Sequence, residues 1–148
     1  MKHTYISKAV VLSLVMALPW GSATSQCTTF VKKKCMPKIQ PFTHNGQVNT
    51  STLSAGQTSE YNFTFYAGQA YRILVGSEPV LGEVSFKVLD QSHKVVFDSK
   101  ENDSPDFWDF KMKNTQQLIV QVIIPPSASS SSTPPSGCVS VLVGFKKD

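Results

Sequence analysis

Three aspartates and two aromatic residues are the side chains best suited to hold a ligand. Asp98, Asp103 and Asp106 lie close together in the sequence, and carboxylate oxygens are the ligands that Ca²⁺ prefers. Trp108 follows in the stretch SPDFWDF, and Tyr66 ends the stretch EYNFTFY. Exposed aromatic rings of this kind stack on sugar rings. These residues predict a Ca²⁺ site or a carbohydrate-binding surface.

Catalytic motifs are absent from the sequence. Beyond residue 25 there are only two histidines, and His44 and His93 both stand in turn-like stretches, THNG and QSHK. No serine occupies a GxSxG elbow, and there is no GxGxxG, P-loop or HExxH motif. We therefore expect a protein that is not an enzyme, with a small hydrolase as the alternative.

The three cysteines, Cys27, Cys35 and Cys138, predict one disulfide and one free thiol. Cys27 and Cys35 would be about 12 Å apart in a helix and about 26 Å apart in a strand, whereas a disulfide needs Cα atoms within about 7 Å. We expect a Cys35–Cys138 bond, because Pro37 and Pro41 would then lead the chain directly into the first strand. A Cys27–Cys138 bond is the alternative, and a Cys27–Cys35 bond would require this segment to fold back on itself.

The elements that position these side chains are short β-strands. From residue 47 onward, apolar residues alternate with polar ones and turn residues separate the runs. The predicted strands span residues 48–53, 60–66, 70–75, 83–90, 95–98, 106–112, 117–124 and 138–145. This pattern indicates an all-β fold, an antiparallel β-sandwich that is jelly-roll-like and has about eight strands.

The stretch SPDFWDF is predicted to begin one of these strands. Alternation places Trp108, Phe110 and Met112 on one face, where aromatic rings would fill the core. Asp109 then points to solvent and is not expected to be a ligand. If the Trp108 ring packs in the core, it is not free to stack on a sugar ring.

Three strand pairs carry a resemblance to a known domain. They are SAGQTSEYNFTFYAGQAYRILV, EVSFKVLDQSHKVVFDS and DFWDFKMKNTQQLIVQVIIP. Over about residues 47–124 this order resembles the pre-peptidase C-terminal β-sandwich found in secreted bacterial proteins. The resemblance implies a non-catalytic accessory module that binds carbohydrate or protein, and it carries over no site residue.

The N-terminus predicts export. The charged MKHTYISK, the apolar AVVLSLVMALPW and the small, polar GSATSQ follow one another in the order of a secretory signal peptide. We place the signal peptide at residues 1–25, with cleavage after Ser25, and the alternative is a lipoprotein acylated at Cys27. An N-terminal arm, residues 26–46, would be tied by the disulfide to the β-sandwich domain, residues 47–148.

Charge and hydropathy narrow the class of partner. Residues 1–25 contain two of the 14 basic residues and none of the 10 acidic ones, so the remaining chain is almost neutral. A nucleic-acid partner is not expected, nor is a membrane span after the signal. We expect a secreted or periplasmic, non-enzymatic interaction or accessory module of the cell envelope, with a protein or glycan partner. The alternative is a carbohydrate-binding or Ca²⁺-assisted module. We expect no cofactor, and Ca²⁺ only in that alternative.

Overall fold

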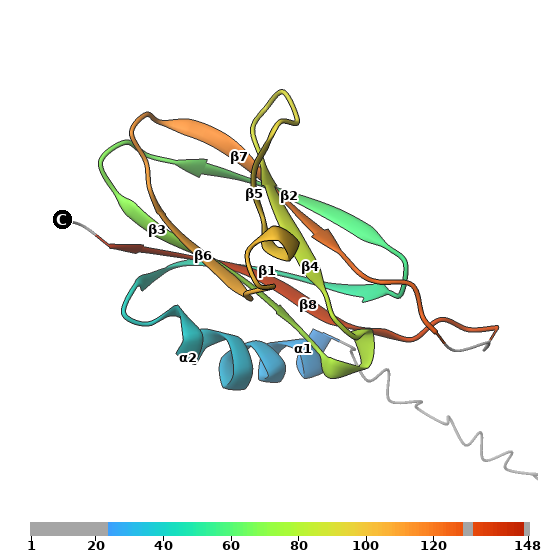
Figure 1. The fold of residues 1–148 in the computed structure, drawn as a ribbon. Helices are drawn as coiled ribbons and strands as arrows, with labels where there is room; N and C mark the ends of the chain where they lie inside the picture. Colours follow the sequence, from blue (N-terminus) through green and yellow to red (C-terminus); the bar gives the residue numbers. More distant parts are fainter. Residues whose placement is uncertain (1–23, 129–131, 147–148) are drawn as a thin grey trace, which may run out of the picture.

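The structure is a computed structural model that describes residues 24–128 and 132–146, and eight β-strands lie within them (Figure 1). The strands are β1 Thr43–Ser54, β2 Thr58–Phe65, β3 Ala70–Ser77, β4 Ser85–Leu89, β5 Val95–Asp98, β6 Phe107–Lys111, β7 Gln116–Ile123 and β8 Ser136–Lys146. Each of the eight predicted strands is present. Two short 3₁₀ helices, η2 (Pro79–Leu81) and η3 (Ser99–Glu101), stand in the loops after β3 and β5.

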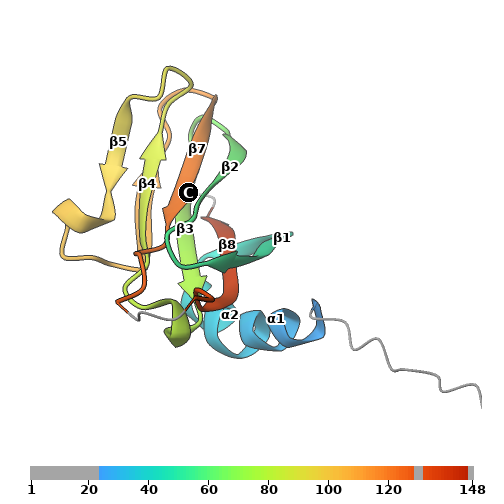
Figure 2. The same cartoon turned by 90° about the vertical axis from the view of Figure 1, so that its right-hand side faces the viewer.

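The strands form two four-stranded sheets that lie face to face (Figure 2). The strand order is β1-β8-β3-β6 in one sheet, called sheet A here, and β2-β7-β4-β5 in the other, called sheet B. Every pairing is antiparallel. These two orders are those of a jelly roll, and the predicted antiparallel β-sandwich is confirmed.

The core lies between the sheets because apolar residues alternate along each strand. Phe65 is fully buried, and its ring meets Tyr71 and Phe110 edge-on with centroids 4.9 and 5.2 Å apart. Trp108 and Phe110 pack against this core and Met112 is buried within it. The predicted core face of the SPDFWDF strand is therefore correct.

The N-terminal arm is helical. The elements predicted from the sequence were all β-strands, and no helix was predicted for this segment. It consists of α1 (Thr24–Phe30), a π-helical turn η1 (Val31–Cys35) and α2 (Met36–Ile39), together called the helical arm. It lies across the outer face of sheet A (Figure 1). Its buried residues recur every four positions, at Cys27, Val31, Cys35 and Ile39.

The π-helical turn keeps this buried stripe on one face. A spacing of four drifts around an α-helix, which has 3.6 residues per turn. The Met36 N–H donates to the carbonyl of Val31, five residues back, and this wider turn offsets the drift. Val31, Cys35 and Ile39 can therefore all pack on Leu74 and Leu142, which point outward from β3 and β8.

The disulfide joins Cys27 to Cys138, with Cα atoms 5.4 Å apart, and Cys35 is free and buried. The expected Cys35–Cys138 bond is wrong, and its alternative is correct. The helix is the reason, because it separates Cys27 from Cys35 by about two turns along its axis. Only Cys27 then reaches the start of β8, whereas Cys35 lies over β3.

The boundaries of the arm also differ from the prediction. β1 begins at Thr43, so the arm ends before residue 46, and the pairing of β1 with β8 is irregular between His44 and Val48. Residues 1–23 of the predicted signal peptide lie outside the described residues, and cleavage after Ser25 stays a prediction. No helix in the described part of the chain is long and apolar enough to cross a membrane.

Candidate functional site

The helical arm approaches sheet A closely because two strand positions beneath it are glycines. A Cβ at Gly76 would lie 2.3 Å from the Cys35 sulfur, and a Cβ at Gly144 would lie 3.2 Å from Cγ2 of Ile39 and 2.7 Å from Cβ of Phe42, just after the arm. All these separations are shorter than an ordinary van der Waals contact. The arm therefore packs on the bare backbone of β3 and β8 at these points.

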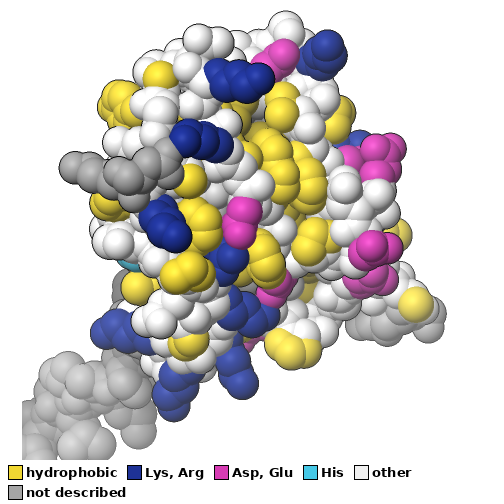
Figure 3. Space-filling model, turned by 60° about the vertical axis from the view of Figure 1, so that its left-hand side comes forward, with side chains coloured by type: hydrophobic (Ala, Val, Ile, Leu, Met, Phe, Trp, Pro, Cys, Tyr) yellow, Lys and Arg dark blue, Asp and Glu magenta, His cyan; other side chains and the backbone are white. Residues whose placement is uncertain are grey.

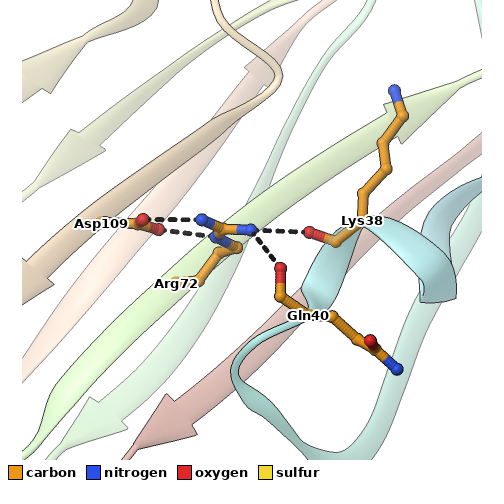
Figure 4. Close-up of polar contacts among 4 residues, drawn as sticks. All are labelled: Lys38, Gln40, Arg72 and Asp109. Carbon is orange, nitrogen blue, oxygen red and sulfur yellow. Dashed lines mark hydrogen bonds and ion pairs between the residues drawn. The ribbon is translucent and has the colours of Figure 1, made fainter.

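Arg72 fastens the end of the helical arm to sheet A (Figure 4). Its Nη1 donates hydrogen bonds to the carbonyls of Lys38 and Gln40, at 2.8 and 2.9 Å. Its Nε and Nη2 donate to the two oxygens of Asp109, each at 2.7 Å. The guanidinium thus binds the carbonyls at the C-terminus of α2, where a positive charge complements the helix dipole.

Two aromatic rings complete the surroundings of Arg72. The guanidinium carbon lies 4.1 Å from the centroid of Phe107 and 4.9 Å from that of Phe42, within range of a cation–π contact. The Asp109 carboxylate raises the pKa of the Arg72 guanidinium. Asp109 was expected only to face solvent, and the structure gives it this ion-pair role.

A groove lies between the helical arm and the end of β3. It has a volume of about 360 Å³. Phe30 and Leu74 contribute apolar side chains, and Lys34, Lys38, Glu78 and Asp106 contribute charged ones. Lys38 and Asp106 form an ion pair across it. An apolar floor with a charged rim is the anatomy of a protein-binding surface.

The charges around this groove are unevenly distributed. The helical arm carries four exposed lysines, Lys32, Lys33, Lys34 and Lys38, and no acidic residue. Figure 3 shows basic side chains from the top of that view down to a group at its lower left, and acidic side chains on its right-hand side and near its centre. Because Lys38 is paired with Asp106, the positive charge of the arm comes mainly from Lys32, Lys33 and Lys34.

Cys35 lines the same groove, but its chemistry there is weak. Its side chain is buried, and this burial raises the pKa of the thiol from its ordinary value of 9.0 to about 11. A cysteine nucleophile reacts as the thiolate, which this environment disfavours near neutral pH. The groove therefore has features suited to binding and lacks an activated sulfur.

Two of the three aspartates of the predicted Ca²⁺ site, Asp98 and Asp106, make ion pairs in the structure. Asp98 accepts a hydrogen bond from the Lys100 N–H at the start of η3 and pairs with Lys87. Asp106 pairs with Lys38, and Asp103 stands in a turn with a φ of 61°. Among the described residues, no three His, Cys, Asp or Glu side chains are grouped so that they could hold a metal ion.

The two aromatic residues proposed for sugar stacking differ in their surroundings. Trp108 is half-buried and stacks on Phe97 and Phe110, with centroids 4.9 and 4.2 Å away. Trp108 thus packs against the core, as its alternation with Phe110 predicted, and its role in a sugar site stays a prediction. Tyr66 is 57% exposed and lines a separate cavity at the end of β2, together with Tyr71.

His93 lies in a turn, as predicted, whereas His44 lies in β1, where the pairing of β1 with β8 becomes irregular. Nε2 of His44 is hydrogen-bonded to the Gln47 carbonyl at 3.0 Å, and His93 lies in the turn between β4 and β5 with a φ of 63°. Both belong to parts of the sandwich remote in sequence from the groove residues of β3, and neither lines the groove.

The fold and this surface define the class as a jelly-roll β-sandwich whose outer face is covered by a disulfide-tied helical arm. No protein-family model matches the chain, and no curated protein matches it either. Among solved structures, the chain is similar to the crystal structure of PliG from Aeromonas hydrophila, a periplasmic lysozyme inhibitor of g-type lysozyme. The two share 14% identity with a TM-score of 0.50, and the likeness covers 72% of this chain and 89% of that one. At this identity the likeness establishes the fold.

Proposed function

We propose that this chain is an exported, non-enzymatic module that binds a protein, and that the protein is a lysozyme. The observation that carries the proposal is the likeness to the periplasmic lysozyme inhibitor over 89% of that inhibitor's chain. The expected class, a non-enzymatic interaction module of the envelope, agrees with such a role. The resemblance to pre-peptidase C-terminal domains is a separate prediction.

Two features favour export. The N-terminal sequence has the order of a signal peptide. The Cys27–Cys138 bond joins residues 111 positions apart, and disulfides of this structural kind persist in oxidising compartments.

The groove beside the helical arm is the surface proposed to contact the lysozyme. Glycoside hydrolases carry a pair of carboxylates at the scissile bond, and lysines complement such a negatively charged cleft. Lys34 and Lys38 stand at the rim of the groove with exposed side chains, and Lys32 and Lys33 lie beside them on the arm. The apolar floor of the groove would form the contact from which water is excluded. The lysines would orient the lysozyme through charge attraction.

An inhibition assay with purified chain beginning at Gln26 tests the proposal. Lysis of cell-wall suspensions by g-type and c-type lysozymes is measured with increasing protein, and binding is followed by biolayer interferometry. We expect stoichiometric inhibition of at least one lysozyme. The double variant Lys34→Ala/Lys38→Ala should weaken it, whereas Lys94→Ala/Lys100→Ala, which removes two exposed lysines elsewhere, should not.

Two results would count against this function. If no lysozyme of the panel is bound or inhibited, the proposed partner is wrong. If inhibition is found and is equally sensitive to both double variants, the enzyme responds to overall charge and the groove is not the contact surface.

A further inference from the structure

We propose that a second cavity, at the opposite side of sheet A from the helical arm, binds a neutral saccharide. The cavity has a volume of about 290 Å³ and lies where the β2–β3 turn, the start of β1 and the end of β8 meet. It is lined by Asn45, Gln47, Phe63, Thr64, Tyr66, Gln69, Tyr71, Val143 and Phe145. None of these residues belongs to the groove beside the arm.

The walls of this cavity are aromatic and uncharged. Phe63, Tyr66, Tyr71 and Phe145 provide four rings, and no Lys, Arg, Asp or Glu lines the cavity. Tyr66 is 57% exposed, so its ring can meet a ligand without rearrangement of the core. Aromatic faces of this kind pack against the C–H faces of sugar rings.

Two amide side chains of the cavity, those of Asn45 and Gln69, have oxygens that already accept hydrogen bonds. Oδ1 of Asn45 accepts a hydrogen bond from the Gln47 N–H at 3.0 Å. Oε1 of Gln69 accepts one from the Tyr71 hydroxyl at 3.1 Å. That hydroxyl in turn accepts the Tyr66 N–H at 2.9 Å, so its position is set from both sides.

Fixing the amide oxygens leaves the amide nitrogens as donors. The described residues provide no hydrogen-bond partner for Nδ2 of Asn45 or Nε2 of Gln69. Their donors would meet acceptor oxygens of a ligand, such as sugar hydroxyls or an acetamido carbonyl. Recognition would then combine ring stacking with a few placed polar groups, as is usual in small-molecule sites.

Other classes of ligand fit this cavity less well. An ionic ligand would find no opposite charge there, and a purely apolar ligand would bury the amide donors without partners. A neutral saccharide has both the apolar ring faces and the hydrogen-bond acceptors that these walls require. The cavity lies at the lower end of the size range of small-molecule sites, about 300–1,000 Å³, and is suited to a single sugar ring.

Titration with defined oligosaccharides tests this inference. Triacetylchitotriose, cellotriose and maltotriose are added separately to ¹⁵N-labelled protein, and binding is followed by NMR shifts and calorimetry. We expect at least one probe to bind with millimolar affinity or better and to shift the side-chain amide signals of Asn45 and Gln69. A preference for triacetylchitotriose would identify the acetamido group as the acceptor.

Variants separate this cavity from the rest of the surface. Tyr66→Ala should weaken binding about tenfold, the equivalent of one aromatic contact, and Tyr66→Phe should keep the affinity. Gln69→Glu keeps the oxygen that accepts from Tyr71 but replaces the donor nitrogen, so it should weaken binding without disturbing the fold. Gln91→Ala, at an exposed glutamine in another turn, serves as the control.

The inference is overturned if no probe binds, or if binding is unchanged in both Tyr66→Ala and Gln69→Glu. Shifts confined to Lys34 and its neighbours on the helical arm would also overturn it, because the saccharide would then occupy the other surface. The saccharide titrations contain no lysozyme, so their outcome does not depend on whether the protein inhibits one. The saccharide site and the proposed inhibitory function can therefore fail separately.

Discussion

Arg72 and Asp109 face each other across β3 and β6 and are joined by two parallel hydrogen bonds of 2.7 Å. The remaining nitrogen of the guanidinium binds carbonyls of the helical arm. One side chain therefore connects an edge strand of sheet A with a segment that precedes the whole sandwich in the sequence. Only the arginine side chain, with its planar fork of donors, can make both sets of contacts at once.

Replacing Arg72 with alanine should loosen the helical arm. The variant removes two charge-assisted hydrogen bonds to carbonyls, which matter more than the ion pair because Asp109 is 40% exposed and screened by solvent. We expect a loss of about 2 kcal/mol in the free energy of unfolding, measured by urea denaturation. Arg72→Lys should recover only part of this loss, because lysine keeps the charge without the fork.

Asp109→Asn is the matched test of the ion pair. It removes the charge but leaves the bonds from Arg72 to Lys38 and Gln40, so we expect a loss of less than about 1 kcal/mol. A larger loss for Asp109→Asn than for Arg72→Ala would show that the carboxylate, and not the arm, is the main partner of the arginine.

Gly76 should tolerate no side chain while Cys35 is present. The Cβ of Gly76→Ala would stand 2.3 Å from the Cys35 sulfur, and relieving such overpacking costs about 1–3 kcal/mol. In the double variant Gly76→Ala/Cys35→Ala the clashing atom is gone, so the second substitution should restore part of the stability. Thermal melts of the three variants check this coupling, and simple additivity of the two losses would contradict it.

The sandwich was predictable because its physical signal is local and repeated. Alternation in EYNFTFY places Phe63 and Phe65 on one face, and turn residues stand between the runs, so strand positions follow from period two alone. The partner of each strand is set by contacts between distant residues. The jelly-roll order could therefore be assigned only as a class.

The arm and its contacts were harder to infer. Cys27, Val31, Cys35 and Ile39 do form an apolar stripe, but its spacing of four departs from 3.6 and three lysines interrupt it. The spacing of four and the single arginine in the apolar strand AYRILV were the sequence features that could have indicated the helical arm and its contact with sheet A. The wrong disulfide followed from the missing helix, because cysteine pairing depends on where a helix carries each Cβ.

The Cys27–Cys138 bond should stabilise the protein substantially. It closes a loop across 111 residues, and bonds across long loops contribute about 2–5 kcal/mol. Cys27→Ser should lower the melting temperature clearly, whereas Cys35→Ser should leave the bond intact. Peptide mapping of the unreduced protein checks the pairing, and recovery of a peptide that joins Cys35 to Cys138 would contradict the structure.

Cys35 should make the stability of the protein fall at alkaline pH. Burial raises the pKa of its thiol in the folded state to about 11 from an ordinary 9.0. Below pH 9 the thiol is protonated in both states and contributes no pH dependence. Between pH 9 and 11 the unfolded state loses its proton first, so unfolding becomes more favourable as the pH rises, and above pH 11 the loss levels off.

We expect the free energy of unfolding to decline by about 2 kcal/mol because of this thiol. The measurement is the difference between the wild-type and Cys35→Ala curves of unfolding free energy against pH, so that contributions common to both proteins cancel. The two curves should converge as the pH rises from 9 to 11, and parallel curves would show that the buried thiol does not titrate as its surroundings require.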